Sequence, residues 1–309
     1  MKDAPTRDAY GQALVDFGAD PRIVVLDAGV SDSTRSKKFG DKFPDRFFNM
    51  GIAEADMVCT AAGLATTGKI PFATGFACFL LGRTMDQVLV SIAYSNTNVK
   101  LVGTHTGLSV GEDGPSAQMI VDIAYTRAMP NMIVVQPADW EETVQATRAL
   151  VDYKGPAYFR LGRPKVKGIF DSSYKFEIGK GRVVKKGSDL VIFATGIMVQ
   201  ESLVAMEMLE KENINVTLVN ISTLKPIDRE LVIDMATSHK AIITAEDHNY
   251  IGGLGDAVGE VLLTEQISKP FKRIAVNDQF AETGTGPQLF EKYGLSANHI
   301  AKAVRDSLQ

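Results

Sequence analysis

Glu54 is the first candidate for chemistry, because it lies in the opening turn of a small-residue, apolar stretch that follows a short β-rich run, in the segment NMGIAEA from Asn49 to Ala55. A helix that starts after a parallel strand begins at the carboxyl end of the sheet, where open α/β folds bind ligands. Burial against Ile52 and Met57 would keep this acid protonated and able to donate to a heterocycle nitrogen. The alternative is that Glu54 only complements the helix dipole.

Two aromatic residues follow in the segment FATGFACF. Phe76 and Phe79 have the i,i+3 spacing that puts both rings on one helical face. Gly75, just before them, would let a flat ring approach the backbone. The segment therefore predicts a wall against which a planar ligand stacks, with two ordinary core residues as the alternative.

A long glycine-rich loop comes directly after a predicted strand and reads GTHTGLSVGEDGP from Gly103 to Pro115. It holds His105, one of only four histidines in the chain, together with Glu112 and Asp113. Ordinary connections are shorter, so the loop indicates a binding or catalytic site. A mobile surface loop with a single histidine is the alternative.

Two arginines stand at the end of the last predicted strand of this region, in RLGRP. Arg160 and Arg163 could clamp a phosphate or carboxylate, or they could be solvated residues at a domain boundary. The run GGLG at Gly252–Gly255 does not follow its strand directly, so we interpret it as a tight turn before a helix and not as a dinucleotide fingerprint.

The strands and helices that position these residues are predicted from alternating β-rich and helical patterns in the sequence. The first half predicts strands at 23–26, 47–50, 70–74, 99–104, 132–135 and 156–160, and helices at 53–67, 79–94, 117–129 and 139–153, the last opened by the N-cap candidate Asp139. After a Gly, Lys, Pro and Ser-rich stretch, the second half predicts strands at 190–194, 216–219, 241–245 and 272–275, and helices at 199–212, 230–238, 256–263 and beyond Ser296. We expect an α/β protein with two doubly wound domains, at 1–165 and 189–309, joined by a linker at 166–188.

Composition narrows the class of protein. The 309 residues are 45% hydrophobic and 23% charged, with a net charge of −4 and no basic stripe with interleaved aromatics, so a soluble globular protein that binds no nucleic acid is expected. No apolar run reaches the roughly 18 residues of a membrane-spanning helix, and the polar start predicts a cytoplasmic location. Cys59 and Cys78 are expected to be reduced core residues, and no metal site is expected in this chain.

Five segments in order, FNMGIAEADM, FATGFACF, THTGLSVGEDGP, PNMIVVQPAD and RLGRP, resemble the C-terminal section of transketolase, in particular the separately encoded C-terminal subunit of split transketolases. The resemblance covers essentially the whole chain. It implies a first domain that binds the aminopyrimidine of thiamine diphosphate and a second, smaller domain of the transketolase C-terminal type. The expected activity is transfer of a two-carbon ketol unit from a ketose or ketose phosphate to an aldose.

The resemblance also implies roles for single residues. Glu54 resembles the catalytic glutamate that binds the pyrimidine ring, and Phe76 and Phe79 resemble the aromatics that stack on it. His105 resembles a catalytic, substrate-binding histidine. The remaining residues that the resemblance assigns to substrate binding are Asp113, Arg163 and Ser33. Three positions depart from the family pattern: Gly82 replaces a third aromatic, Ala117 a donor-binding histidine and Gly29 an acid, so an altered sugar substrate is a live hypothesis.

The family's diphosphate motif, GDG with a downstream Asn, is absent from the sequence. The resemblance therefore implies that an N-terminal transketolase subunit supplies the diphosphate site and most ligands of Mg²⁺ (or Ca²⁺), in an α₂β₂ assembly that is active only as a complex. Two alternatives stay open: the β subunit of a thiamine-dependent 2-oxo-acid dehydrogenase, and a non-catalytic assembly or regulatory subunit.

Overall fold

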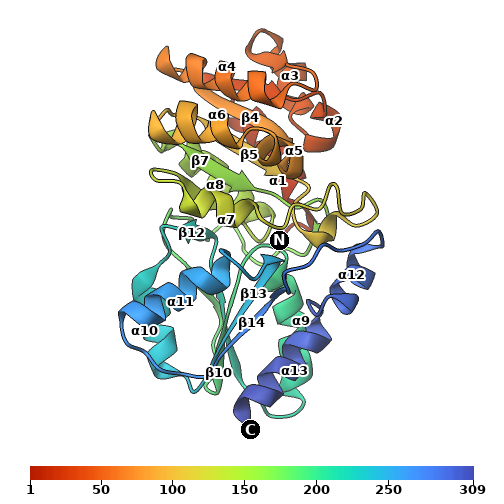
Figure 1. Cartoon of the computed structure of the whole chain (residues 1–309), viewed down its shortest axis with the longest axis vertical. Helices are drawn as coiled ribbons and strands as arrows, with labels where there is room; N and C mark the ends of the chain where they lie inside the picture. The colour runs from red at the N-terminus through yellow and green to blue at the C-terminus, as the bar shows by residue number, and fades with distance from the viewer.

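The computed structural model describes all residues from Met1 to Gln309. Two β-sheets, each covered by helices, are stacked along the long axis of the molecule, and the N-terminus lies near their junction (Figure 1). We call the seven-stranded sheet with its helices the first domain and the five-stranded sheet with its helices the second domain. The α/β class and the two-domain architecture are as predicted, while the residue boundaries of the domains stay a prediction.

The first domain is built on a buried sheet in the order β12-β6-β7-β5-β4-β2-β3, parallel except for β12. Its strands are β2 (Ile23–Asp27), β3 (Phe47–Asn49), β4 (Ile70–Phe76), β5 (Lys100–Thr104), β6 (Ile133–Val135), β7 (Ala157–Arg160) and β12 (Thr223–Lys225). Most of these strands are buried along their length, which explains why they appear in the sequence as apolar runs. β12 comes from the second half of the chain and pairs antiparallel with β6, which the sequence did not predict.

Helices cover both faces of this sheet. They are α1 (Thr6–Phe17), α2 (Ser31–Thr34), α3 (Lys37–Lys42), the 3₁₀ turn η1 (Pro44–Arg46), α4 (Glu54–Thr66), α5 (Ala77–Gly82), α6 (Met85–Gln87), the π-helix η2 (Val88–Tyr94), the 3₁₀ turn η3 (Leu108–Val110), α7 (Asp122–Ala128) and α8 (Trp140–Asp152). Asp139 caps α8 as predicted, since its side chain accepts from the Glu142 N–H at 2.9 Å.

Two predicted helices of the first domain are shorter in the structure. The single helix expected at 79–94 is broken into α5, α6 and η2, and the break falls at Thr84, whose backbone is not helical (φ −127°, ψ 19°) and whose hydroxyl donates to the carbonyl of Leu80. The helix expected from Ala117 begins only at Asp122, because the preceding residues form a loop that bonds to the second domain, with Gln118 donating to the carbonyl of Glu282.

The second domain has a sheet in the order β14-β13-β10-β11-β9, in which only β9 is antiparallel. Its elements are β9 (Arg182–Lys185), β10 (Leu190–Ala194), α9 (Met198–Glu210), β11 (Val216–Asn220), α10 (Arg229–Ser238), β13 (Ile242–Asn249), α11 (Leu254–Thr264), β14 (Phe271–Val276), α12 (Gly286–Lys292) and α13 (Ala297–Leu308). A short ribbon of β1 (Ala4–Pro5) and β8 (Lys165–Val166) lies beside the first domain. β9 falls inside the segment 166–188 that was expected to be a linker.

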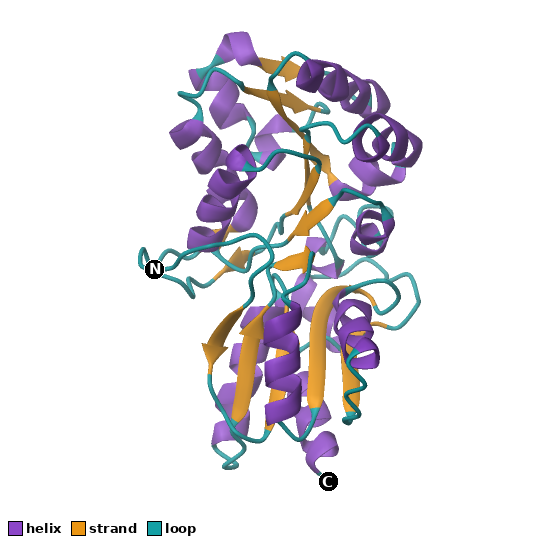
Figure 2. Cartoon of the chain, turned by 90° about the vertical axis from the view of Figure 1, so that its left-hand side faces the viewer, coloured by secondary structure: helices purple, strands orange, loops and turns teal.

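The carboxyl ends of the two sheets have different surroundings. We call the carboxyl ends of β2 to β5 the open edge and those of β10, β11 and β13 the covered edge, because the first domain lies directly against the latter (Figure 2). At the covered edge, Gln136 of the first domain lies against Thr195 and Gly196, and Asn220 donates to both carboxylate oxygens of Glu142 at 2.8 and 2.9 Å.

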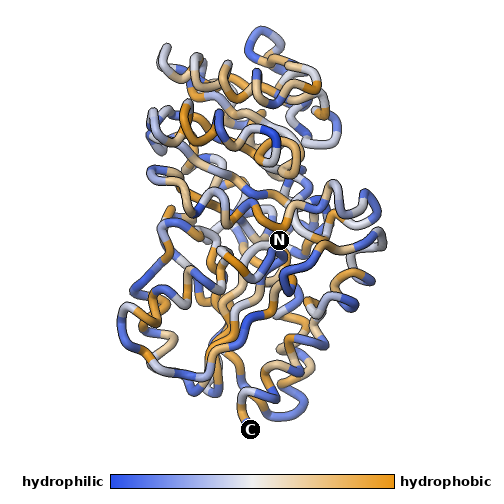
Figure 3. Tube along the Cα trace, viewed as in Figure 1, coloured by the Kyte–Doolittle hydropathy of each residue, from blue (hydrophilic) through white to orange (hydrophobic).

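Apolar residues are concentrated along the strands and the helix faces that pack on them (Figure 3). One cluster continues from the first sheet into the second domain, since it includes both Met119 and Val219. No helix combines the length and apolar character needed to cross a membrane. Both cysteines are free, as expected, but the prediction that both lie in the core is wrong, because Cys59 is exposed and Cys78 is only partly buried.

Candidate functional site at the open edge

Glu54 is the first residue of α4 and is 5% exposed. Its side chain caps no helix N–H; instead Nη1 of Arg83 donates to both carboxylate oxygens, at 2.9 and 3.0 Å. The expectation that Ile52 helps to bury this acid is wrong, because Ile52 is 81% exposed, whereas Met57 is fully buried one turn along the helix. The structure therefore has Glu54 in an ion pair whose arginine is half in solvent.

Phe76 and Phe79 are both partly exposed, and neither belongs to a core cluster. Phe76 ends β4 and Phe79 lies in α5, so they do not share a helix, but their rings are stacked with centroids 6.2 Å apart and planes 29° from parallel. The Arg83 guanidinium lies 4.3 Å from the Phe79 centroid. Arg83 thus covers Glu54 and one ring of the aromatic pair together.

His105 follows β5 in a left-handed backbone conformation, with φ of 58°, and is 3% exposed. Its ring lies 3.9 Å from that of Phe76, and Nη1 of Arg7 lies 2.8 Å from Nε2. Burial, and then the charge of nearby arginines, lowers the pKa of His105 to about 3, so the ring is neutral near pH 7. Because Arg7 can only donate, Nε2 accepts and the proton sits on Nδ1, which lies 2.9 Å from the Thr104 hydroxyl.

Arg163 and Ser33 lie near His105, and Asp113 pairs with Arg163. Nη1 of Arg163 donates to the Val110 carbonyl at 2.8 Å and to Oδ1 of Asp113 at 3.1 Å, and both side chains are more than one third exposed. Ser33 lies in α2 and accepts at its carbonyl from Arg7 at 3.0 Å. Glu54, Phe76, Phe79, His105, Asp113, Arg163 and Ser33 therefore lie around the open edge.

Arg160 is not part of this cluster, and both interpretations of the arginine pair in RLGRP are wrong for it, because it neither joins Arg163 in an anion clamp nor is solvated. Its side chain is 1% exposed, and Nε donates to Oδ2 of Asp122 at 2.7 Å. It also donates to the carbonyls of Met119 and Asp247. A residue so enclosed holds the two domains together and cannot reach a ligand at the open edge.

Three functional candidates escaped the sequence analysis. Arg7 lies on α1, contacts His105 98 residues away and keeps a buried Nε without a partner. Arg83 binds Glu54. Asp27, fully buried at the end of β2, accepts from the Val30 N–H and from the hydroxyls of Thr34 and Ser36, and so fixes the turn that carries Ser33.

The signals that could have found these residues were partial. Asp27 is an acid at the end of an apolar strand, and the pattern Ala9, Tyr10, Ala13, Leu14 would have indicated the helix that carries Arg7.

The positions that depart from the family pattern also lie in or beside this region. Gly29 has φ of +80° and faces the backbone of Gly51 at 3.4 Å, so a side chain there would be strained and crowded. Gly82 is exposed, and a Cβ added to it would meet no atom within 4 Å. Ala117 is 8% exposed within the loop that carries Asp113.

The glycine run at 252–255 forms a tight turn into α11, as interpreted from the sequence. Gly252 has φ of +78°, and the N–H groups of Leu254 and Gly255 donate to the carboxylate of Glu246 at 2.7 and 2.8 Å. A Cβ on Gly253 would lie 1.9 Å from Oε2 of Glu246. The chain's own carboxylate fills the helix N-terminus that a nucleotide phosphate would need.

Family comparison matches nearly the whole chain. Residues 2–168 match the model "Transketolase, pyrimidine binding domain" and residues 179–300 match "Transketolase, C-terminal domain". A putative transketolase C-terminal section of Methanocaldococcus jannaschii is 44% identical, over 98% of this chain and 96% of its own length. A 6-deoxy-6-sulfo-D-fructose transketolase subunit of Clostridium is 38% identical, over 97% and 93%.

Two further relatives bear on the length and the fold. Human transketolase is 38% identical over 97% of this chain, which spans only 48% of the human protein. A solved structure described as a split gene transketolase, inactive beta4 tetramer, superposes with a TM-score of 0.92 at 47% identity, covering 99% of this chain and 98% of that one. The similarity to the split protein thus extends over both domains.

Proposed function

The chain belongs to the thiamine-diphosphate-dependent transketolase family, and we propose that it is the C-terminal subunit of a two-subunit transketolase that transfers a two-carbon ketol unit from a ketose donor to an aldose acceptor. The observation that carries the proposal is the grouping at the open edge of a buried carboxylate, two stacked and partly exposed rings, and a neutral histidine. The substrate, the partner and the roles of single residues are part of the proposal.

Glu54, Phe76 and Phe79 fit the aminopyrimidine of thiamine diphosphate. The carboxylate is buried, yet its one side-chain partner, Arg83, is 49% exposed. The rings offer a flat apolar face beside that carboxylate. Glu54 would bind a pyrimidine ring nitrogen and hold a proton there, while the two rings stack on the heterocycle and exclude water. When bound, the cofactor supplies the carbon nucleophile of ketol transfer.

His105 would bind the sugar near the reacting carbon. Its ring is neutral and lies against that of Phe76, with the two planes tilted by 39°, and its Nε2 is the acceptor side. An acceptor at this position suits a substrate hydroxyl if Arg7 moves toward the substrate's anionic end. A neutral imidazole also costs less to keep buried than an imidazolium.

Arg7 and Arg163 would bind the anionic end of the sugar, with Ser33 and Asp113 at the margins of the same subsite. Positive charge prevails here, because Arg7, Arg35 and Arg163 face only Asp8 and Asp113. The buried, partnerless Nε of Arg7 supports a ligand acceptor at this point. A phosphate or a sulfonate satisfies such a cluster equally well, so both belong in a donor screen.

The proposed partner is an N-terminal transketolase subunit that carries the diphosphate site and most ligands of Mg²⁺ or Ca²⁺, in an α₂β₂ assembly. Support comes from the 48% coverage of the single-chain human relative and from the split-gene structure. Exposed apolar side chains on α6 and η2 also support subunit contact. They are Met85, Leu89, Val90 and Tyr94. A cytoplasmic location stays a prediction.

The proposal is tested by reconstitution with an N-terminal transketolase subunit, thiamine diphosphate and Mg²⁺. Ketol transfer to an aldose phosphate is measured with a ketose phosphate, a 6-sulfo ketose and an uncharged ketose as donors. We expect transfer by the complex, none by this chain alone, and a preference for the anionic donors. A complex that forms but transfers nothing from any donor contradicts the proposal.

The same preparation separates the alternatives. A 2-oxo-acid dehydrogenase β subunit would support decarboxylation of a 2-oxo acid and no ketol transfer. A non-catalytic subunit would leave the partner's activity unchanged when Glu54 is replaced. Either result would replace the transketolase proposal.

A further inference from the structure

The substrate loop, residues 105–118, carries His105 and Asp113 but is held in part from outside its own domain. Asp247, in β13 of the second domain, is 1% exposed and lies against the start of this loop. Its Oδ1 accepts from the Leu108 N–H at 2.7 Å, and its Oδ2 accepts from the Ser109 N–H at 3.1 Å. Both oxygens of one buried carboxylate therefore bind two consecutive loop amides.

Gly107 shows how closely this carboxylate approaches the loop. The residue has φ of +72°, and a Cβ built on it would lie 2.1 Å from Oδ2 of Asp247. No side chain fits between them, so only glycine lets the loop backbone reach the carboxylate. The close approach joins residues about 140 positions apart in the chain.

The second domain holds the far end of the loop as well. Gln118 donates from Nε2 to the carbonyl of Glu282 at 3.1 Å. A Cβ on Gly114 would lie 2.7 Å from the Thr283 hydroxyl, and one on Gly111 would lie 3.4 Å from the Gly284 carbonyl. Contacts with the second domain thus occur on both sides of Asp113.

We propose that Asp247 is a positioning residue, through which the second domain fixes the substrate loop in the shape that presents His105 and Asp113 to the sugar. The sugar-binding part of this inference rests on the proposed function; the bracing of the loop does not. The two hydrogen bonds that the Asp247 carboxyl group accepts from the loop N–H groups hold consecutive residues of the loop in place, and a glycine-rich loop without them gains conformational freedom.

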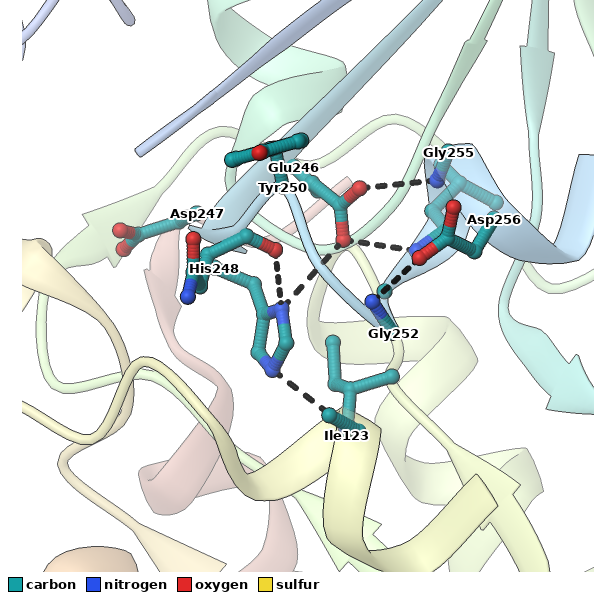
Figure 4. A network of polar contacts seen from close by, with 12 residues as sticks. Ile123, Glu246, Asp247, His248, Tyr250, Gly252, Gly255 and Asp256 are labelled. Carbon is teal, nitrogen blue, oxygen red and sulfur yellow. Dashed lines mark hydrogen bonds and ion pairs between the residues drawn. The ribbon is translucent and has the colours of Figure 1, made fainter. Parts of the chain in front are cut away.

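Glu246, the neighbouring residue, offers a matched control. It is also fully buried and also accepts two backbone N–H groups, but these belong to Leu254 and Gly255 of its own domain. Figure 4 shows the two carboxylates pointing to opposite sides of β13, Glu246 toward Gly255 and Asp247 away from it. Asp247→Asn and Glu246→Gln each keep one side-chain oxygen as an acceptor and replace the other by NH₂. Each variant therefore loses one of its two bonds to backbone N–H groups, and only the first loses a bond to the loop.

The first measurement is hydrogen–deuterium exchange at the amides of Leu108 and Ser109 in the chain alone. Asp247→Asn should speed exchange there by roughly 10- to 100-fold, because one acceptor is lost and the new NH₂ group faces a loop N–H, while Glu246→Gln should leave these two amides unchanged. Equal acceleration in both variants, or none in Asp247→Asn, would overturn the proposal. This result does not depend on any activity.

The second measurement is made on the reconstituted enzyme. Asp247→Asn should raise KM for the sugar by about 10-fold with a smaller change in kcat and no change in cofactor affinity, because the loop faces the sugar and not the pyrimidine. Unchanged sugar KM beside accelerated exchange overturns the link to substrate. A wild-type complex without ketol transfer refutes the proposed function. The exchange result would then still test whether Asp247 holds the loop.

A second variant approaches the same contact from the loop side if Asp247→Asn fails to fold. Gly107→Ala drives a methyl group into the Asp247 carboxylate and should give the same accelerated exchange at Leu108 and Ser109. Gly68→Ala is its control, because Gly68 also has positive φ, at +85°, but has open space around it. Accelerated exchange at Leu108 in both glycine variants would overturn the proposal.

Discussion

The open edge and the covered edge are both formed by the carboxyl ends of parallel strands, but the first is partly exposed to solvent and the second is packed against another domain. Each gathers polar groups at the carboxyl ends of parallel strands: Glu54 and His105 at the open edge, Glu246 and Asp247 at the covered edge. At the open edge, Arg83 and Arg163 remain partly in solvent. At the covered edge, Gln136 and other residues of the first domain occupy the crevice.

The comparison shows that fold alone does not make a ligand site. Open α/β sheets bind ligands at their carboxyl ends because those ends converge and leave a crevice. At the covered edge the first domain occupies that crevice, and the polar groups there bind backbone N–H groups and one another. Mutations at the open edge should therefore change kinetics. Mutations at the covered edge should change stability, except at Asp247, which holds the substrate loop and should also change the sugar KM.

Glu54→Gln should have the largest kinetic effect. If Glu54 holds the proton on the pyrimidine, loss of its acid–base function should lower kcat of the reconstituted complex by about 10³- to 10⁴-fold. Asp56→Asn is the control, because Asp56 lies in the same first turn of α4 but is exposed. Steady-state ketol transfer measures both, and near-normal activity in Glu54→Gln would remove this residue from the mechanism.

Arg160 and Arg163 test the comparison within a single motif. Arg160→Met leaves Asp122 buried without its cation and should lower the free energy of unfolding by about 3–4 kcal/mol in urea titrations. Arg163→Met removes a partly exposed side chain, so stability should change by less than about 1 kcal/mol.

If Arg163 binds the anionic end of the sugar as proposed, Arg163→Met should raise KM of the reconstituted enzyme for a sugar phosphate by about 10- to 100-fold, because one charge-assisted contact would be lost. An uncharged ketose serves as the internal control and should show no such change. If the two variants exchanged these phenotypes, the division into open and covered edges would be wrong.

Local patterns in the sequence were enough to predict most strands and the cluster of site residues. Apolar runs marked β2 to β7, and motifs at the strand ends located Glu54, Phe76 and His105. This works because the carboxyl ends of parallel strands lie at one edge of the sheet, whatever the order of the strands.

The features that were not predicted depend on contacts far apart in the chain. The pairing of β12 with β6, the contact of Arg7 with His105 and the burial of Arg160 against Asp122 join residues from 38 to about 100 positions apart. A motif shows that an arginine follows a strand; only the packing of the second domain decides whether solvent can reach it.

Substitutions of Glu246 and His248 should have the smallest effect, a change in how stability depends on pH, and this effect concerns the covered edge alone. Burial raises the pKa of Glu246 to about 7 and lowers that of His248 to about 4, although Nδ1 of His248 lies 3.7 Å from Oε2 of Glu246. Arg160, Arg127 and Asp122 are the other charged groups that face the pair. The buried pair is therefore uncharged between about pH 4 and 7.

The titrations of Glu246 and His248 change the free energy of unfolding in opposite directions as pH rises. Glu246, an acid with a raised folded-state pKa, contributes stability that is complete below its ordinary pKa of 4.5 and is lost as pH rises toward 7. His248, a base with a lowered folded-state pKa, gives stability that increases as pH rises from about 4 to its ordinary 6.5. In the wild-type protein the two slopes largely cancel.

Glu246→Gln should break this balance. Relative to wild type, its free energy of unfolding should increase between pH 4.5 and 7, with a slope of at most about 1.4 kcal/mol per pH unit, because one titrating proton is removed. His248→Gln should give the opposite slope, and Glu207→Gln, at an exposed position of α9, should run parallel to wild type. Urea unfolding at half-unit pH steps measures all three. Parallel curves for Glu246→Gln would mean that water reaches the covered edge, and that it differs from the open edge less than its packing indicates.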